Sequence, residues 1–135
     1  MARILIVEDN ADLLEILREV MSADHEVITA HRGEDAIRQA RDNRPDLVIL
    51  DLQLPAMDGI EAGRSIKREL GPDGVVILAL TALAQMGDSE AVLRSGCCDA
   101  YLSKPASLAE IRAMVDDLLG GGGGSGSVVD TRAPG

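Results

Sequence analysis

The chain has 135 residues, enough for one domain with a real core and too few for two domains of ordinary size. Its formal net charge of -10, from 23 acidic and 13 basic residues, argues against a nucleic-acid-binding surface and against attraction to anionic membranes. Hydrophobic residues make up 46% of the chain although Phe and Trp are absent, so we expect an aliphatic core, which suits a buried parallel sheet covered by helices.

The start of the sequence and its cysteines predict a reducing, cytoplasmic location. No apolar run approaches the roughly 18 residues of a membrane span, and Glu8 and Asp9 follow the first apolar run too soon for a signal peptide. Cys97 and Cys98 are neighbours, and a trans peptide holds their Cα atoms about 3.8 Å apart, closer than an ordinary disulfide allows. We therefore expect two reduced thiols.

Five short apolar runs alternate with longer amphipathic segments along the chain. The runs are typical of buried strands and cover Ile4 to Val7, Val27 to Ala30, Leu47 to Leu50, Val75 to Leu80 and Ala100 to Leu102. The longer segments are predicted helices, and the capping boxes Asp58-x-x-Glu61 and Ser107-x-x-Glu110 mark the start of two of them. Five successive βα units predict an α/β fold, a doubly wound five-stranded parallel sheet with five helices on its two faces.

The composition changes abruptly after Leu119. Residues 120–127 contain only Gly and Ser, which is typical of a flexible linker, and residues 128–135 are too few to fold by themselves. We therefore expect a folded domain over residues 1–119 and a flexible linker or tail over residues 120–135.

Polar side chains follow four of the five predicted strands. The first strand is followed by Glu8 and Asp9, the third by Asp51, the fourth by Thr81, and the fifth by a segment that contains Lys104. Functional groups of a doubly wound sheet collect at the carboxyl ends of its strands. Three carboxylates, a hydroxyl and an ammonium are therefore expected to converge on one crevice.

Such a group of side chains suits phosphoryl transfer. Crowded carboxylates repel one another, and a bound divalent cation is the simplest way to keep all three ionised. Mg²⁺ binds through one or two carboxylates plus waters and phosphate oxygens, so a partial cage of this kind fits Mg²⁺ better than Ca²⁺. One carboxylate could then attack phosphorus to form an acyl phosphate, while a nearby Lys and a hydroxyl neutralise the charge that spreads over the phosphoryl oxygens.

Four separated segments resemble the signature segments of response-regulator receiver domains of two-component signalling. They match in order and in spacing, and they are Glu8-Asp9-Asn10, residues 48–59 around Asp51, Thr81-Ala82, and Tyr101-Leu102-Ser103-Lys104-Pro105. The resemblance covers residues 3–119 and implies the flavodoxin-like receiver fold. It also implies a protein that takes a phosphoryl group from a histidine kinase or a histidine phosphotransfer protein and changes its surface for a downstream protein target.

The resemblance implies a role in metal binding for four positions. Asp51 would be the phospho-acceptor and a metal ligand, Asp9 would bind Mg²⁺ directly, and Glu8 would act mainly through water. The backbone carbonyl of Gln53 would complete the protein's share of the ligands. The family often has Asp where this chain has Glu8, a variation that we do not expect to impair metal binding.

Other matched positions would contact the phosphoryl group or respond to it. Lys104 would pair with the phosphoryl oxygens, and Thr81 would donate a hydrogen bond to one of them. Tyr101 matches the aromatic position that turns inward when the Thr moves, and Lys104-Pro105 matches the family's cis peptide.

Two other functions remain open at this stage. A Mg²⁺-dependent phosphohydrolase would also use an Asp nucleophile, but those enzymes resemble one another in an Asp-x-Asp signature whose second Asp acts as acid and base, and Gln53 stands there in this chain. A pseudo-receiver would keep the fold without the chemistry, although the reactive residues are all present. Because the sequence shows no DNA-binding or catalytic module, we expect a stand-alone, single-domain receiver; the alternative, which the sequence leaves open, is a fragment of a longer regulator or hybrid kinase.

The first predicted helix has a wide apolar stripe. Its apolar residues span roughly 160° of the helix circumference, more than the ~100° that packing on one sheet face needs, and they are Leu13, Leu14, Ile16, Leu17, Val20 and Met21. Leu14 and Met21 lie at one margin, so we expect them to be partly exposed and to receive the kinase or relay partner. The alternative is that the neighbouring last helix covers them.

Overall fold

The computed structural model describes residues 2–52, 59–71, 73–81, 93–104 and 106–120. Within these ranges, five parallel strands form one sheet in the order β2-β1-β3-β4-β5. The strands are β1 (Arg3–Val7), β2 (Glu26–Ala30), β3 (Leu47–Asp51), β4 (Val76–Thr81) and β5 (Ala100–Ser103). The helices of the described ranges are α1 (Ala11–Ser22), α2 (Gly33–Asn43), α3 (Gly59–Leu70) and α6 (Leu108–Gly120).

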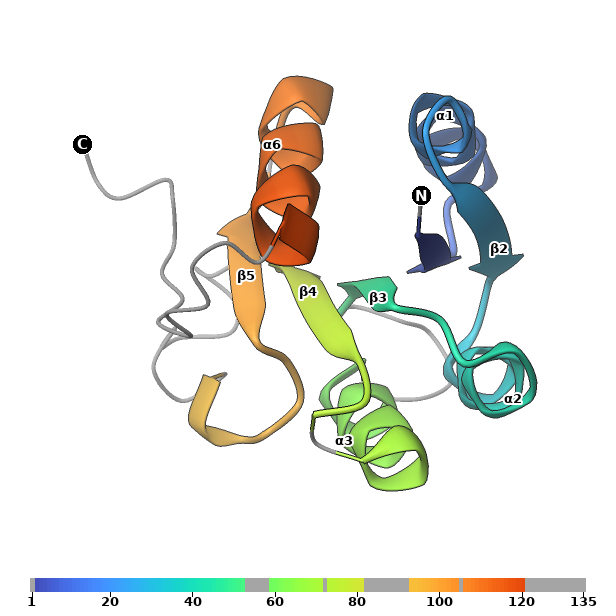
Figure 1. Ribbon diagram of the computed structural model, residues 1–135, viewed down its shortest axis with the longest axis vertical. Coiled ribbons are helices and arrows are strands. Elements are labelled where there is room, and N and C mark those ends of the chain that lie inside the picture. Colours follow the sequence, from blue (N-terminus) through green and yellow to red (C-terminus); the bar gives the residue numbers. More distant parts are fainter. Residues whose placement is uncertain (1, 53–58, 72, 82–92, 105, 121–135) are drawn as a thin grey trace.

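Helices cover both faces of the sheet. Figure 1 shows α1 and α6 together on one face and α2 and α3 together on the other. The predicted doubly wound α/β fold is thus confirmed, with strand boundaries within a residue of those expected. The helix expected between β4 and β5 falls largely on residues 82–92, outside the described ranges.

Each strand contributes side chains to two separate clusters, one on each face of the sheet. In β1, Leu5 and Val7 point to the α2–α3 side, whereas Ile4 and Ile6 point to the α1–α6 side. All five residues of β3 are buried. A strand covered on both faces needs apolar residues at every position, which explains why these strands are continuous apolar runs in the sequence.

The sheet register aligns the strand ends that carry the polar residues. Val7 of β1 pairs with Leu50, Asp51 pairs with Leu80, and Thr81 pairs with Ser103. The carboxyl ends of β1, β3, β4 and β5 therefore lie along one edge. The connection from β1 leads to β2 on one side of β1, and the chain then crosses to β3 on the other side. In such folds ligands bind in the crevice outside this switch point.

The packing of α1 differs from the expectation for its apolar stripe. Leu14 and Met21 are 6% and 2% exposed, and they belong to one cluster with Ile111 and Met114 of α6. The prediction that these two residues receive a partner is therefore wrong, and the alternative that the last helix covers them is right. The apolar surface that remains open lies on the other margin, where Ile16 is 45% exposed.

Local signals at other elements agree with the structure. The predicted capping box at the start of α6 is confirmed, since Ser107 N donates to Glu110 Oε1 over 2.8 Å and Glu110 N donates to Ser107 Oγ over 3.0 Å. Asp58 of the other predicted box lies outside the described residues. Cys97 and Cys98 are both buried, and neither forms a disulfide among the described residues, as expected. In the part of the chain that the structure describes, every helix is too short or too polar to cross a bilayer.

Candidate phosphorylation and metal site

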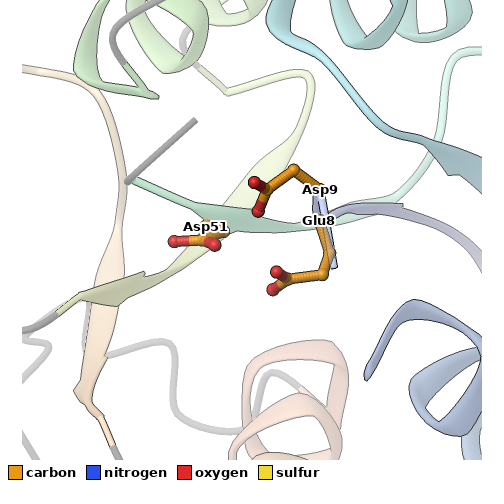
Figure 2. Close-up of side chains that lie close together, drawn as sticks. All are labelled: Glu8, Asp9 and Asp51. Carbon is orange, nitrogen blue, oxygen red and sulfur yellow. The ribbon is translucent and has the colours of Figure 1, made fainter. Parts of the chain in front are cut away.

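Three carboxylates meet at the switch point of the sheet. Glu8 and Asp9 directly follow β1, and Asp51 is the last residue of β3. One oxygen from each side chain lies within 4.8 Å of the others, and Figure 2 shows the three side chains converging on one space. Glu8 and Asp51 are each 2% exposed, whereas Asp9 is exposed to solvent. The cluster therefore consists of two buried carboxylates and a third that is open to solvent.

The Glu8 carboxylate is buried, and only one of its two oxygens has a hydrogen-bond donor among the described residues. Its Oε2 accepts a hydrogen bond from Asn10 N over 3.2 Å, but its buried Oε1 has no hydrogen-bond donor among the described residues. Burial and, next, the negative charge of Asp51 raise the pKa of Glu8 from its ordinary 4.5 to about 7, although the Asn10 N–H and the Lys104 ammonium oppose the shift. A buried carboxylate oxygen without a donor is suited to face a cation.

A positive charge also lies close to Asp51. Lys104, which follows β5, places its Nζ 3.0 Å from Asp51 Oδ1, and its side chain is 28% exposed. Asp51 thus has both a lysine ammonium and two carboxylates as close neighbours. This is the arrangement in which an incoming phosphoryl group would meet both a cation site and an ammonium.

Leu52, which follows Asp51, and Gly59 lie in close contact. Gly59 N donates to Leu52 O over 3.2 Å, and a Cβ on Gly59 would lie 2.3 Å from Leu52 Cα, closer than any side chain could be accommodated without a backbone shift. Gly59 therefore lets α3 begin directly beside the end of β3. Gln53, whose carbonyl the resemblance implies as a metal ligand, lies outside the described residues.

The remaining predicted residues are placed in part. The backbone of Thr81 lies at the end of β4, opposite Ser103, and its side chain is outside the description. Tyr101 is 6% exposed and packs in the cluster on the α2–α3 side of the sheet. Pro105, and with it the expected cis peptide, also lies outside the described residues.

Asn10 has a structural role beside the site that was not predicted from the sequence. Asn10 is the N-cap of α1, with its Oδ1 accepting from Leu13 N over 3.0 Å, and its own N–H is the donor that holds Glu8. An Asn immediately before an apolar-periodic segment is an ordinary N-cap signal, so the cap could have been predicted. The link to Glu8 could not, because it depends on how the buried carboxylate is turned.

The fold and the site define a class of protein, an α/β domain with an acidic pocket and a lysine at the switch point of its sheet. The chain belongs to the response regulator receiver domain family, whose sequence profile matches residues 4–116. The cluster of Glu8, Asp9 and Asp51 fits the phospho-aspartate site with Mg²⁺ of this family. The chain is thus a signalling receiver domain of the two-component type rather than a conventional enzyme.

Individual relatives agree with this assignment. The chain is 36% identical over 118 residues to the polar-differentiation response regulator DivK of Brucella anthropi, a match that covers 87% of this chain and 95% of the relative. The receiver domain of a sensor histidine kinase from Pseudomonas aeruginosa, whose structure has a magnesium ion coordinated in the active-site cleft, is 34% identical with a TM-score of 0.76, covering 88% of this chain and 98% of that one. A CheY-like receiver domain protein from Methanospirillum hungatei is 26% identical with a TM-score of 0.79, covering 89% and 94%.

Proposed function

We propose that the chain accepts a phosphoryl group on Asp51 in a Mg²⁺-dependent reaction, in the cytoplasm, from a histidine kinase or a histidine phosphotransfer protein. The single observation that carries this proposal is the buried Asp51 carboxylate, which lies close to the Glu8–Asp9 pair and 3.0 Å from the Lys104 ammonium. The phosphorylated form would then present a changed surface to a downstream protein target.

The residues present suit a magnesium ion. The carboxylates of Glu8, Asp9 and Asp51 would hold it together with the backbone carbonyl of Gln53, and the buried Glu8 Oε1 without a donor supports this placement. When bound, Mg²⁺ supplies the positive charge that offsets the repulsion between these carboxylates and the incoming phosphoryl oxygens.

The chain's own residues account for the transfer step. A carboxylate oxygen of Asp51 attacks the donor phosphorus, an O–P bond forms, and the P–N bond of the donor phosphohistidine breaks with its electron pair going to the imidazole. Lys104 Nζ, 3.0 Å from Asp51 Oδ1, is close enough to transfer its contact to a phosphoryl oxygen. The Thr81 hydroxyl would donate to another of these oxygens.

Loss of the phosphoryl group would follow from the same residues. Water attacks the phosphorus, the O–P bond to Asp51 breaks, and the carboxylate is restored. Gln53 stands where an Asp would serve as acid and base in a phosphohydrolase, and an amide cannot do this work. We therefore expect self-catalysed phosphorylation and slow dephosphorylation rather than rapid turnover on an outside substrate.

The exposed margin of α1 is the surface we assign to the protein donor. Ile16 is 45% exposed, and Asp12, Glu15 and Glu19 around it are exposed too. Residues 11–24, which include α1, carry four acidic residues and one basic residue. This face therefore fits a partner whose contact surface is apolar at its centre and basic at its rim.

Incubation with acetyl phosphate and Mg²⁺ tests the proposal. We expect about one phosphoryl group per chain, none after chelation of the metal, and none in Asp51→Asn, whose amide is nearly isosteric and cannot form the acyl phosphate. Many turnovers of a generic phosphate ester would point to a phosphohydrolase instead. Failure of the wild-type protein to incorporate phosphate would indicate a pseudo-receiver and overturn the proposal.

A further inference from the structure

The N-cap of α1 and the buried Glu8 carboxylate share one residue. Asn10 has an extended backbone, with φ of -80° and ψ of 113°, and its Oδ1 accepts from Leu13 N over 3.0 Å. Its carbonyl accepts from Leu14 N over 2.9 Å, which closes the first turn of the helix. The side chain and the carbonyl of Asn10 are thus both engaged with α1, so the direction of its N–H is set by the helix.

That N–H is directed at the acidic pocket. It donates to Glu8 Oε2 over 3.2 Å, while Glu8 N donates to Ala30 O over 3.1 Å and so ties the backbone of Glu8 to the end of β2. With Oε2 held by Asn10, the buried Oε1 is left without a donor in the described part of the chain. The anchor on one oxygen therefore determines where the other oxygen of Glu8 lies.

We infer that Asn10 is a positioning residue for the metal site, which couples Mg²⁺ affinity to the first turn of α1. This inference rests on the proposed Mg²⁺ site. Mutation of an outer residue that orients a metal ligand typically lowers metal affinity by roughly 10- to 100-fold. The N-terminus of α1 adds a favourable dipole for the two carboxylates that precede it.

The coupling works in both directions. If ordering of the first turn strengthens Mg²⁺ binding, then Mg²⁺ strengthens the first turn by the same factor, since linkage between two equilibria is reciprocal. A protein that binds along α1 and orders its start would therefore tighten Mg²⁺ binding as well. This connects the exposed margin of α1 to the metal site through one backbone N–H.

Calorimetric titration of Mg²⁺ into the full chain tests the inference with three proteins. Asn10→Ala keeps the N–H and loses the cap, so its Kd should rise about threefold to tenfold, less than the roughly 10- to 100-fold typical of losing an outer partner altogether. Asn10→Ser restores a cap and should return the Kd to the wild-type value. Equal Kd values for wild type and Asn10→Ala would overturn the inference even if the variant unfolds more easily. Equal weakening in Asn10→Ser would also overturn it, because the cap would then not be the cause.

Hydrogen exchange in the wild-type protein gives a second test that needs no variant. The Leu13 N–H donates a hydrogen bond to Asn10 Oδ1, and its hydrogen should exchange more slowly when Mg²⁺ is added. The matched control is the Glu110 N–H at the start of α6, which donates a hydrogen bond to Ser107 Oγ over 3.0 Å. Its exchange should slow only as much as that of the protein as a whole. If Mg²⁺ binds but slows exchange equally at both amides, the coupling between Asn10 and the metal site is overturned and the proposed function is not. A wild-type protein that binds no Mg²⁺ would overturn the proposed function, and this inference with it.

Discussion

Replacement of Glu8 by Gln should stabilise the metal-free protein at pH 8 and reduce its stabilisation by Mg²⁺. The unfolded Glu8 carboxyl releases its proton near pH 4.5, whereas burial and the charge of Asp51 raise its pKa in the folded protein to about 7. Between these pH values the folded state binds more protons than the unfolded state. The free energy of unfolding therefore falls as pH rises from 4.5 to 7, and the full penalty remains at pH 8.

The size of this penalty follows from the shift. A pKa difference of about 2.5 units corresponds to about 3 kcal/mol at about 1.36 kcal/mol per unit, which is an upper limit. Gln has nearly the same shape and no charge to bury, so we expect Glu8→Gln to gain roughly 1 to 3 kcal/mol at pH 8 and almost nothing at pH 4.5. Mg²⁺ should stabilise the wild type more than the variant, since ligand binding to the native state alone adds RT ln(1 + [L]/Kd).

Urea denaturation measures both effects. Wild type, Glu8→Gln and the control Glu19→Gln, which makes the same chemical change at an exposed position of α1, would be unfolded at pH 4.5 and pH 8 with a chelator and again with Mg²⁺. A gain at pH 4.5 as large as at pH 8 would show that Gln improves packing rather than relieving a buried charge. No gain at pH 8 would refute the reasoning on Glu8.

Three further substitutions test other parts of the site. Lys104→Ala should keep Mg²⁺ binding but fail to change partner affinity after phosphorylation, since it removes a phosphate contact and no metal ligand; a normal switch in a partner-binding assay would contradict this. Ile16→Arg should slow transfer from the protein donor about tenfold and leave labelling by acetyl phosphate unchanged. The control Leu108→Arg, at the other large apolar residue that is exposed in the described part of the chain, should slow neither. Equal loss by both routes in Ile16→Arg would indicate damage to the fold. Gly59→Ala should destabilise the protein by about 2 kcal/mol or more in urea, because its Cβ would meet the backbone of Leu52, and an unchanged midpoint would show that the turn can open.

Much of the fold could be predicted from the sequence because its strands are buried. Strands such as β3 are buried on both faces, so each is a continuous apolar run, and the parallel order brings the residues after β1 and β3 to one edge. The meeting of Glu8, Asp9 and Asp51 follows from that topology. Local chemistry also suffices where partners are three residues apart, as at the Ser107–Glu110 box.

Other features depend on contacts that are distant in sequence. The apolar stripe of α1 has two margins of equal appearance, and only the packing of α6 decides that Leu14 and Met21 are covered while Ile16 is open. Similarly, the raised pKa of Glu8 comes from its burial and from Asp51, which lies on another strand. These properties belong to the assembled sheet and its helices, so a pattern along one segment cannot specify them.

The central claim, that Asp51 receives the phosphoryl group, is tested most directly by locating the acyl phosphate in the chain. After incubation with acetyl phosphate and Mg²⁺, reduction with borohydride converts a phosphorylated aspartate to homoserine, which peptide mass spectrometry then places in the sequence. We predict homoserine at position 51 in the wild-type protein and none when Mg²⁺ is chelated. Homoserine at Asp9 with Asp51 unmodified, or equal modification of Asp51 without the metal, would contradict the account.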